Sequence, residues 1–189
     1  MSLPWVVAAI ALLAFIALVA GQKFGANRPV AQEQAVAEIP QGRAPDISNM
    51  SPAERASRLH DRIMQWKSNG RQDSVMAFAP MGIAAYEMLP SLDEDARYDI
   101  GMIGWAADNA DIARAQSDTI LKQNPKHLLG LILGARAAKM QNRGADERSY
   151  YQRLVAAEPT ERAVARNEYI LHEGDITAAL DEARRITRR

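Results

Sequence analysis

An uninterrupted apolar run at residues 3–20, LPWVVAAIALLAFIALVA, constrains this chain more than any other feature. It contains no charged or strongly polar side chain. As a helix it would span about 27 Å, close to the hydrocarbon thickness of a bilayer. Pro4 suits the first turn of a helix, and Trp5 suits the membrane interface. We therefore predict a transmembrane anchor over residues 1–21, in contact with lipid through residues 3–20, with Trp5 and Phe15 as membrane-facing side chains.

Two alternatives to the anchor remain open, a cleaved signal peptide and a helix lying in the lipid interface. A signal peptide has a basic start and small residues before its cleavage point. Here no Lys or Arg precedes the run, and Leu18 stands where a small residue is preferred. Lys23 and Arg28 follow the run, which favours a cytoplasmic C-terminal domain over a periplasmic one. The predicted localisation is a single-pass membrane protein.

The next segment, residues 22–50, changes in composition and is predicted to be a linker. It contains Pro29, Pro40 and Pro45 among scattered Gln, Ala and charged residues. It shows no sustained helical or strand period, and such a composition buries too little apolar surface to offset its ordering entropy. We expect an extended tether.

From position 51 the pattern is helical throughout, which predicts an all-α domain over residues 51–189. Ser51 and Glu54 form a capping box, and Asn69-Gly70 ends the first helix. A second helix is expected to run from about residue 73 to 89 with a kink at Pro80. No window shows the alternating pattern of a strand.

Internal repetition organises the second half of this domain. The segments LKQNP and VAAEP end at Pro125 and Pro159, which are 34 residues apart. The small residues Gly101, Ala113 and Ala135 would let paired antiparallel helices approach closely. A shortened third unit is expected from residue 160, with a turn between helices at positions 174–175. The alternative is an irregular helical bundle with one coincidental spacing.

This pattern resembles the tetratricopeptide repeat (TPR) family over roughly residues 94–189. Arg97, Leu131 and Glu147 depart from the family pattern, which expects large aromatic residues at the first two positions and alanine at the third. The resemblance implies a solenoid of antiparallel helix hairpins that binds partners on a concave face. The order of anchor, tether and repeats also resembles bacterial membrane-anchored TPR proteins of the accessory or assembly type.

The resemblance places one helix of each pair along the concave groove. Residue types enriched at interface hot spots occur at several groove positions. The predicted partner-binding residues are Tyr98, Met102, Trp105, Arg136 and Lys139. That Tyr98 and Trp105 belong instead to the core between helices remains open.

The residue inventory gives little basis for catalysis, so we predict that the chain is not an enzyme. It has no cysteine, and no catalytic, phosphate-loop or zinc-protease motif occurs. Acidic residues at 93–95 and 181–182 are expected in first turns of helices, where they complement the helix dipole. His60, His127 and His172 are interpreted as surface or junction residues. No cofactor or metal is predicted. No nucleic acid is predicted either, since Lys+Arg and Asp+Glu both number 23 and leave no net charge.

These observations lead to one functional hypothesis and one alternative. The chain is predicted to be a non-catalytic structural or accessory subunit, or an assembly factor, of a larger membrane protein complex, with membrane and soluble subunits as partners. The alternative is a membrane-tethered adaptor that recruits a soluble protein or peptide through its groove.

Overall fold

The computed structural model describes residues 49–187, which contain helices and turns and no strand. The predicted anchor at residues 1–21, with Trp5 and Phe15, lies outside the described residues, as does the predicted linker except for positions 49 and 50. Within the described range no helix is both long and apolar enough to cross a bilayer. The helices are α2 (Pro52–Ser68), α3 (Gln72–Glu87), α4 (Glu94–Ala106), α5 (Ala110–Gln123), α6 (Leu128–Met140), α7 (Gly144–Arg162), α8 (Asn167–Leu171) and α9 (Glu173–Thr187).

Local sequence signals define the starts of two helices. At α2 the hydroxyl of Ser51 accepts a hydrogen bond from the Glu54 amide at 3.2 Å, and the Ser51 amide donates to the Glu54 carboxylate at 2.7 Å. At α4 the carboxylate of Asp93 accepts from the Ala96 amide at 2.8 Å. Both bonds satisfy amides that the first turn of a helix leaves unpaired. The predicted capping box is confirmed.

One turn geometry recurs in three helix hairpins. Gly70, Asp108 and Asn142 follow the C-caps of α2, α4 and α6 with φ values of 70°, 56° and 57°. In each turn the next amide donates to the carbonyl five residues earlier, at 2.9, 2.8 and 2.8 Å. This is the Schellman arrangement, which needs a left-handed residue after the C-cap. The short turns make α2/α3, α4/α5 and α6/α7 hairpins.

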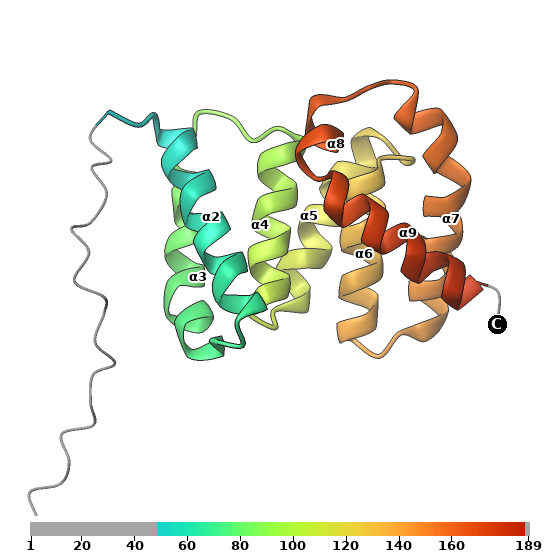
Figure 1. The fold of residues 1–189 in the computed structure, drawn as a ribbon, viewed down its shortest axis with the longest axis horizontal. Helices are drawn as coiled ribbons and strands as arrows, with labels where there is room; N and C mark the ends of the chain where they lie inside the picture. The colour runs from blue at the N-terminus through green and yellow to red at the C-terminus, as the bar shows by residue number, and fades with distance from the viewer. Residues whose placement is uncertain (1–48, 188–189) are drawn as a thin grey trace, which may run out of the picture. The chain divides into compact units, whose positions relative to one another are not determined.

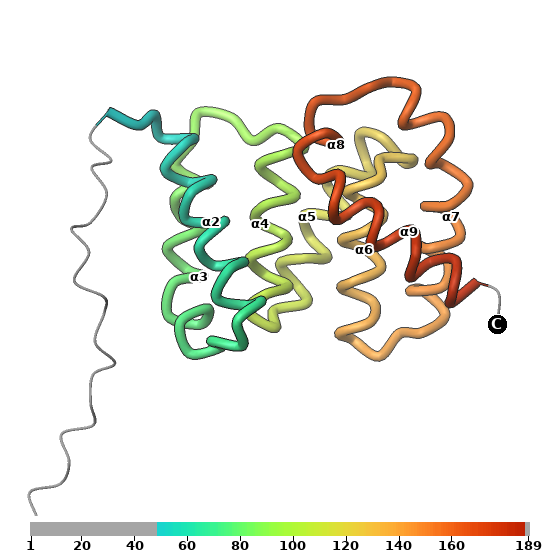
Figure 2. The backbone as a smooth tube through the Cα atoms, viewed as in Figure 1, coloured from blue at the N-terminus to red at the C-terminus, as the bar shows by residue number. Residues whose placement is uncertain are grey.

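The hairpins pack in chain order (Figures 1 and 2). Helices α4 and α6 begin 34 residues apart, as do α5 and α7, so the predicted spacing is present in the structure. Gly101 allows the close approach of α4 and α6, since a Cβ added there would lie 2.5 Å from Leu133 Cδ1. Helix α9 packs against α7 and α6. The described residues are all-α, with consecutive helices packed on one another.

The core consists of two clusters of buried side chains. One joins α2, α3 and the inner face of α4, around Ile63, Tyr86 and Ile103. The other joins α4 to α9, around the fully buried Leu131 and Leu154. The half-buried Trp105 packs against both clusters and links them.

The last third of the domain departs from the predicted pattern. Helix α7 continues through Pro159 to Arg162, and α8 has only five residues. The turn between α8 and α9 lies at His172, so positions 174 and 175 belong to the first turn of α9. Positions 181–182 lie in the interior of α9 rather than in a first turn, so that prediction is wrong.

Candidate functional site

The five predicted partner-binding residues lie along one side of α4 and α6, and they differ in exposure. Tyr98 and Met102 are buried. Trp105 and Arg136 are half-buried, and Lys139 is exposed. The burial of Tyr98 agrees with the core interpretation that the sequence left open.

Helix α9 crosses in front of α6 in the view of Figure 1, and it or the turn before it contacts three of these residues. Arg136 forms an ion pair with Asp175 at 3.0 Å, and Lys139 pairs with Glu182 at 2.6 Å. The His172 ring meets the Tyr98 ring edge-on, with 4.6 Å between centroids. The side predicted to hold a partner is therefore occupied by the C-terminal segment of the same chain.

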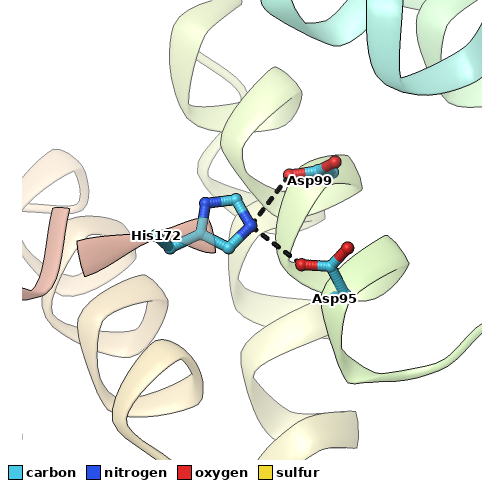
Figure 3. Close-up of side chains that lie close together, drawn as sticks. All are labelled: Asp95, Asp99 and His172. Carbon is cyan, nitrogen blue, oxygen red and sulfur yellow. Dashed lines mark hydrogen bonds and ion pairs between the residues drawn. The ribbon is translucent and has the colours of Figure 1, made fainter. Parts of the chain in front are cut away.

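A cluster of acidic residues and histidines lies at one end of this covered side, where α4 begins. His172 Nε2 lies 2.9 Å from Asp95 Oδ1 and 3.6 Å from Asp99 Oδ1 (Figure 3). On the other side of Asp99, His60 Nε2 from α2 lies 3.5 Å from the same oxygen. The Tyr86 hydroxyl donates a hydrogen bond to Asp99 Oδ2. Helices α2, α3 and α4 and the α8–α9 turn thus meet around one carboxylate.

The environment of the cluster shifts the proton affinities of its members. Burial raises the pKa of Asp99, although the charge of His60 and the hydrogen bond from Tyr86 oppose the rise. Burial alone would lower the pKa of His172, but the hydrogen bond to Asp95 and the charges of Asp99 and Asp95 outweigh it and raise this pKa. Burial and the neighbouring Asp99 charge also raise the pKa of Tyr86. The cluster therefore favours a positive charge on or beside His172.

A cavity of about 710 Å³ opens beside the cluster. Asp95 and Asp99 form part of its wall together with residues from α2, the end of α3 and the loop before α4. Five carboxylate side chains and one guanidinium line it: Glu54, Asp61, Asp93, Asp95, Asp99 and Arg58. An acidic wall of this kind raises the local concentration of cations.

A second polar cluster forms hydrogen bonds to Glu161 in the last turn of α7. The Glu161 carboxylate accepts hydrogen bonds from the Tyr169 hydroxyl at 2.7 Å and the Asn124 amide at 3.0 Å. Burial would raise the pKa of Glu161, but these bonds and the charge of Arg166 outweigh it and lower the pKa. Close by, His127 is fully buried with Nε2 3.2 Å from Glu168 Oε1. The partner of its Nε2 lies within the fold, which indicates a structural role.

The outer face of α3 carries six exposed apolar residues, with the exposed carboxylates of Asp73 and Glu87 near its two ends. Met76, Met81 and Met88 expose 55%, 51% and 84% of their surface. Ala77, Pro80 and Ala84 lie exposed among them, while the opposite side of α3 packs against α2 and α4. We call Met76, Ala77, Pro80, Met81, Ala84 and Met88 the α3 face.

Sequence reasoning did not find the cluster at Asp95, Asp99 and His172. His172 lies 77 residues from Asp95, and only the fold brings them together. The spacing of four between Asp95 and Asp99 put two carboxylates on one face of a helix, and this was the available signal. His172 follows Glu168 by four positions in the sequence, but in the structure the Glu168 carboxylate contacts His127.

Comparison with known proteins gives no relative. No family model matches the sequence, and no curated protein or solved structure matches it significantly.

Proposed function

We propose that this chain is a non-catalytic accessory subunit or assembly factor of a larger membrane protein complex. In this proposal residues 3–20 anchor it in the bilayer, residues 22–50 are the tether, and a TPR-like helical domain on the cytoplasmic side docks on another subunit. The absence of cysteine and of catalytic motifs from the sequence supports a non-catalytic role.

The observation that carries the proposal is the exposed α3 face. Met76 and Met81 lie on α3 and Met88 is its C-cap residue, in the hairpin at one end of the helical stack (Figure 1), and all three side chains are more than half exposed. Exposed apolar side chains grouped on one face of a helix can form an interaction site, and flexible methionine side chains adapt to a partner surface. The occupant we propose is an apolar surface of a protein subunit held at the same membrane, because the apolar run at residues 3–20 would confine the domain there.

The covered groove favours this docking mode over the adaptor alternative. A peptide entering the groove would have to displace α9 and break the pairs of Arg136 with Asp175 and Lys139 with Glu182. The α3 face can be contacted with no such rearrangement. Docking through the outside of the stack therefore needs less conformational free energy than docking through the groove.

The test is affinity purification of the full-length protein from membranes in mild detergent, with mass spectrometry of the retained proteins. Two further samples are a protein that begins at Ser51 and a full-length Met81→Glu/Met88→Glu variant. We expect the full-length protein to retain defined membrane subunits. We expect truncation to lose most of them and the double variant to lose the subunit that contacts α3, since a buried carboxylate without a partner is strongly unfavourable.

The matched control is Val164→Glu/Ile170→Glu, which places the same two charges on other exposed apolar positions. This control should retain all partners. Retention of the same partners by the α3 variant, or their loss in both double variants, contradicts docking through α3. A soluble partner retained equally by the truncated protein indicates the adaptor function instead.

A further inference from the structure

Three potential metal-ligand atoms converge where α4 meets the α8–α9 turn. One oxygen each from Asp95 and Asp99 and one nitrogen from His172 lie within 4.8 Å of one another. Figure 3 shows the two carboxylates directed from one face of α4 toward the imidazole. An acidic cluster with a histidine also occurs as a simple ion-pair network, so the geometry alone does not identify a metal site.

An independent observation comes from the bonding of Asp99. Its side chain is only 7% exposed, and its Oδ1 accepts no hydrogen bond from any donor within residues 49–187. Two imidazole nitrogens face this oxygen at 3.5 and 3.6 Å, longer than ordinary hydrogen bonds. A buried carboxylate oxygen without a partner is costly, and such oxygens in folded proteins usually contact a donor, water or an ion.

The 3.6 Å between Asp99 Oδ1 and His172 Nε2 fits two ligands of one metal ion. Two atoms each about 2.1 Å from a tetrahedral zinc ion lie about 3.4 Å apart. Asp95 Oδ1 and His172 Nε2 are closer, at 2.9 Å, and would separate by about half an ångström when their hydrogen bond is replaced by metal bonds. That change is within the reach of side-chain rotation.

We propose that Asp95, Asp99 and His172 bind one Zn²⁺ ion, with a water molecule from the adjoining cavity as the fourth ligand. Imidazole nitrogen and carboxylate oxygen are ordinary zinc donors. The cavity wall supplies an acidic path for the cation. Tyr86, whose hydroxyl donates a hydrogen bond to Asp99 Oδ2, is a positioning residue that holds the carboxylate in place.

The ion would link two parts of the chain that are distant in sequence. Asp95 and Asp99 belong to α4, whereas His172 directly precedes α9. Zinc at this position would fix the start of α9 over the groove, since a ligand that binds only the folded arrangement stabilises it. This inference does not depend on docking through the α3 face.

The experiment is isothermal titration calorimetry, in which zinc chloride is titrated into full-length protein in mild detergent after bound metal has been removed with a chelator. The wild type should bind one zinc ion per chain. Asp99→Asn and His172→Gln should each weaken the affinity at least about tenfold. The control Glu168→Gln removes the carboxylate beside the other buried histidine and should bind zinc as the wild type does. Circular dichroism checks that each variant keeps its helices.

A second measurement uses the wild type alone and does not depend on the folding of variants. Long-range ¹H–¹⁵N NMR of the three imidazole rings should show zinc shifting the His172 Nε2 resonance and leaving His127 unchanged. The absence of zinc binding by the wild type overturns the proposal. So does binding of zinc by both Asp99→Asn and His172→Gln with the affinity of the wild type, or a zinc-induced shift confined to His127.

Discussion

Arg136 in α6 and Asp175 in α9 form a half-buried ion pair with 3.0 Å between nitrogen and oxygen, across 39 positions of the chain. The same guanidinium lies over the Trp105 ring, 4.9 Å from its centroid. Arg136 therefore connects the C-terminal helix to the aromatic side chain that joins the two core clusters. The pair links the start of α9 to α6, in addition to the apolar contacts that α9 makes in the core through Ile176, Ala179, Leu180 and Ala183.

Breaking this pair should loosen α9 more than the rest of the domain. We expect Asp175→Asn to lower the free energy of unfolding by about 1–3 kcal/mol, because a half-buried charged hydrogen bond is lost and Arg136 keeps its charge. Hydrogen exchange of α9 amides should accelerate more than that of α4 amides. The control Asp118→Asn disrupts an exposed i,i+4 pair with Arg114 and should change stability by less than about 0.5 kcal/mol. Equal effects of the two substitutions would contradict the role given to Arg136.

Two glycines should respond to alanine in opposite directions. A Cβ at Gly104 would lie 2.7 Å from Ile112 Cγ2 and 3.2 Å from the Ala113 backbone nitrogen, so the hairpin of α4 and α5 would have to open. We expect Gly104→Ala to destabilise the fold by about 1–3 kcal/mol. Gly174 has no atom within 4 Å of such a Cβ, and Gly174→Ala should stabilise α9 by about 0.5–1 kcal/mol. Chemical denaturation followed by circular dichroism measures both free energies of unfolding. A change of the same sign in the two variants would contradict the close packing described at Gly104.

Acid should destabilise the domain through His127. Burial lowers the pKa of His127 below its ordinary value of 6.5, although the hydrogen bond and charge of Glu168 oppose the shift. The charge of Arg166 lowers this pKa further, Glu94 raises it, and the Tyr169 ring lies 5.0 Å away. His127 therefore becomes protonated near pH 6.5 in the unfolded chain but only at lower pH in the folded chain. Its contribution to stability falls as the pH drops from 6.5 toward the lowered pKa.

The variant His127→Gln lacks this titration. The difference in free energy of unfolding between wild type and variant should shrink as the pH falls from about 7 to about 5. Denaturation curves at several pH values provide the measurement. A difference that stays constant or grows on acidification would contradict the burial effect assigned to His127.

Local features of the fold could be predicted from the sequence because their causes are local. The capping box at Ser51 and the stop at Gly70 each depend on bonds within a few residues. The spacing of α4 and α6 was visible because equivalent hairpins need equivalent lengths. These features define the hairpin architecture.

Features set by distant contacts could not be predicted. Proline in a helix interior removes a backbone hydrogen bond, yet α7 continues through Pro159. Its last turn carries Glu161, which accepts hydrogen bonds from the distant Asn124 and Tyr169. The helical pattern of α9 shows an apolar face but does not specify its partner helix. The pairing of Arg136 with Asp175, across 39 positions of the chain, depends on the fold as a whole.

The candidate metal cluster has the same origin. Asp95 and Asp99 lie on one face of α4, and this spacing is readable in the sequence. The third member, His172, lies beside α4 because α8 ends after five residues and the chain turns toward α4 there. A histidine that looks like a surface residue in the sequence is thereby brought against a buried carboxylate.

Docking through the α3 face is tested most directly by site-specific photo-crosslinking in intact membranes. A photoreactive residue replaces Met81 in the full-length protein, and a matched sample carries it at Val155, which is exposed on α7. We predict that position 81 crosslinks to a subunit of a membrane complex and that position 155 does not. Crosslinks to that subunit from position 155 and none from position 81 would contradict docking through α3.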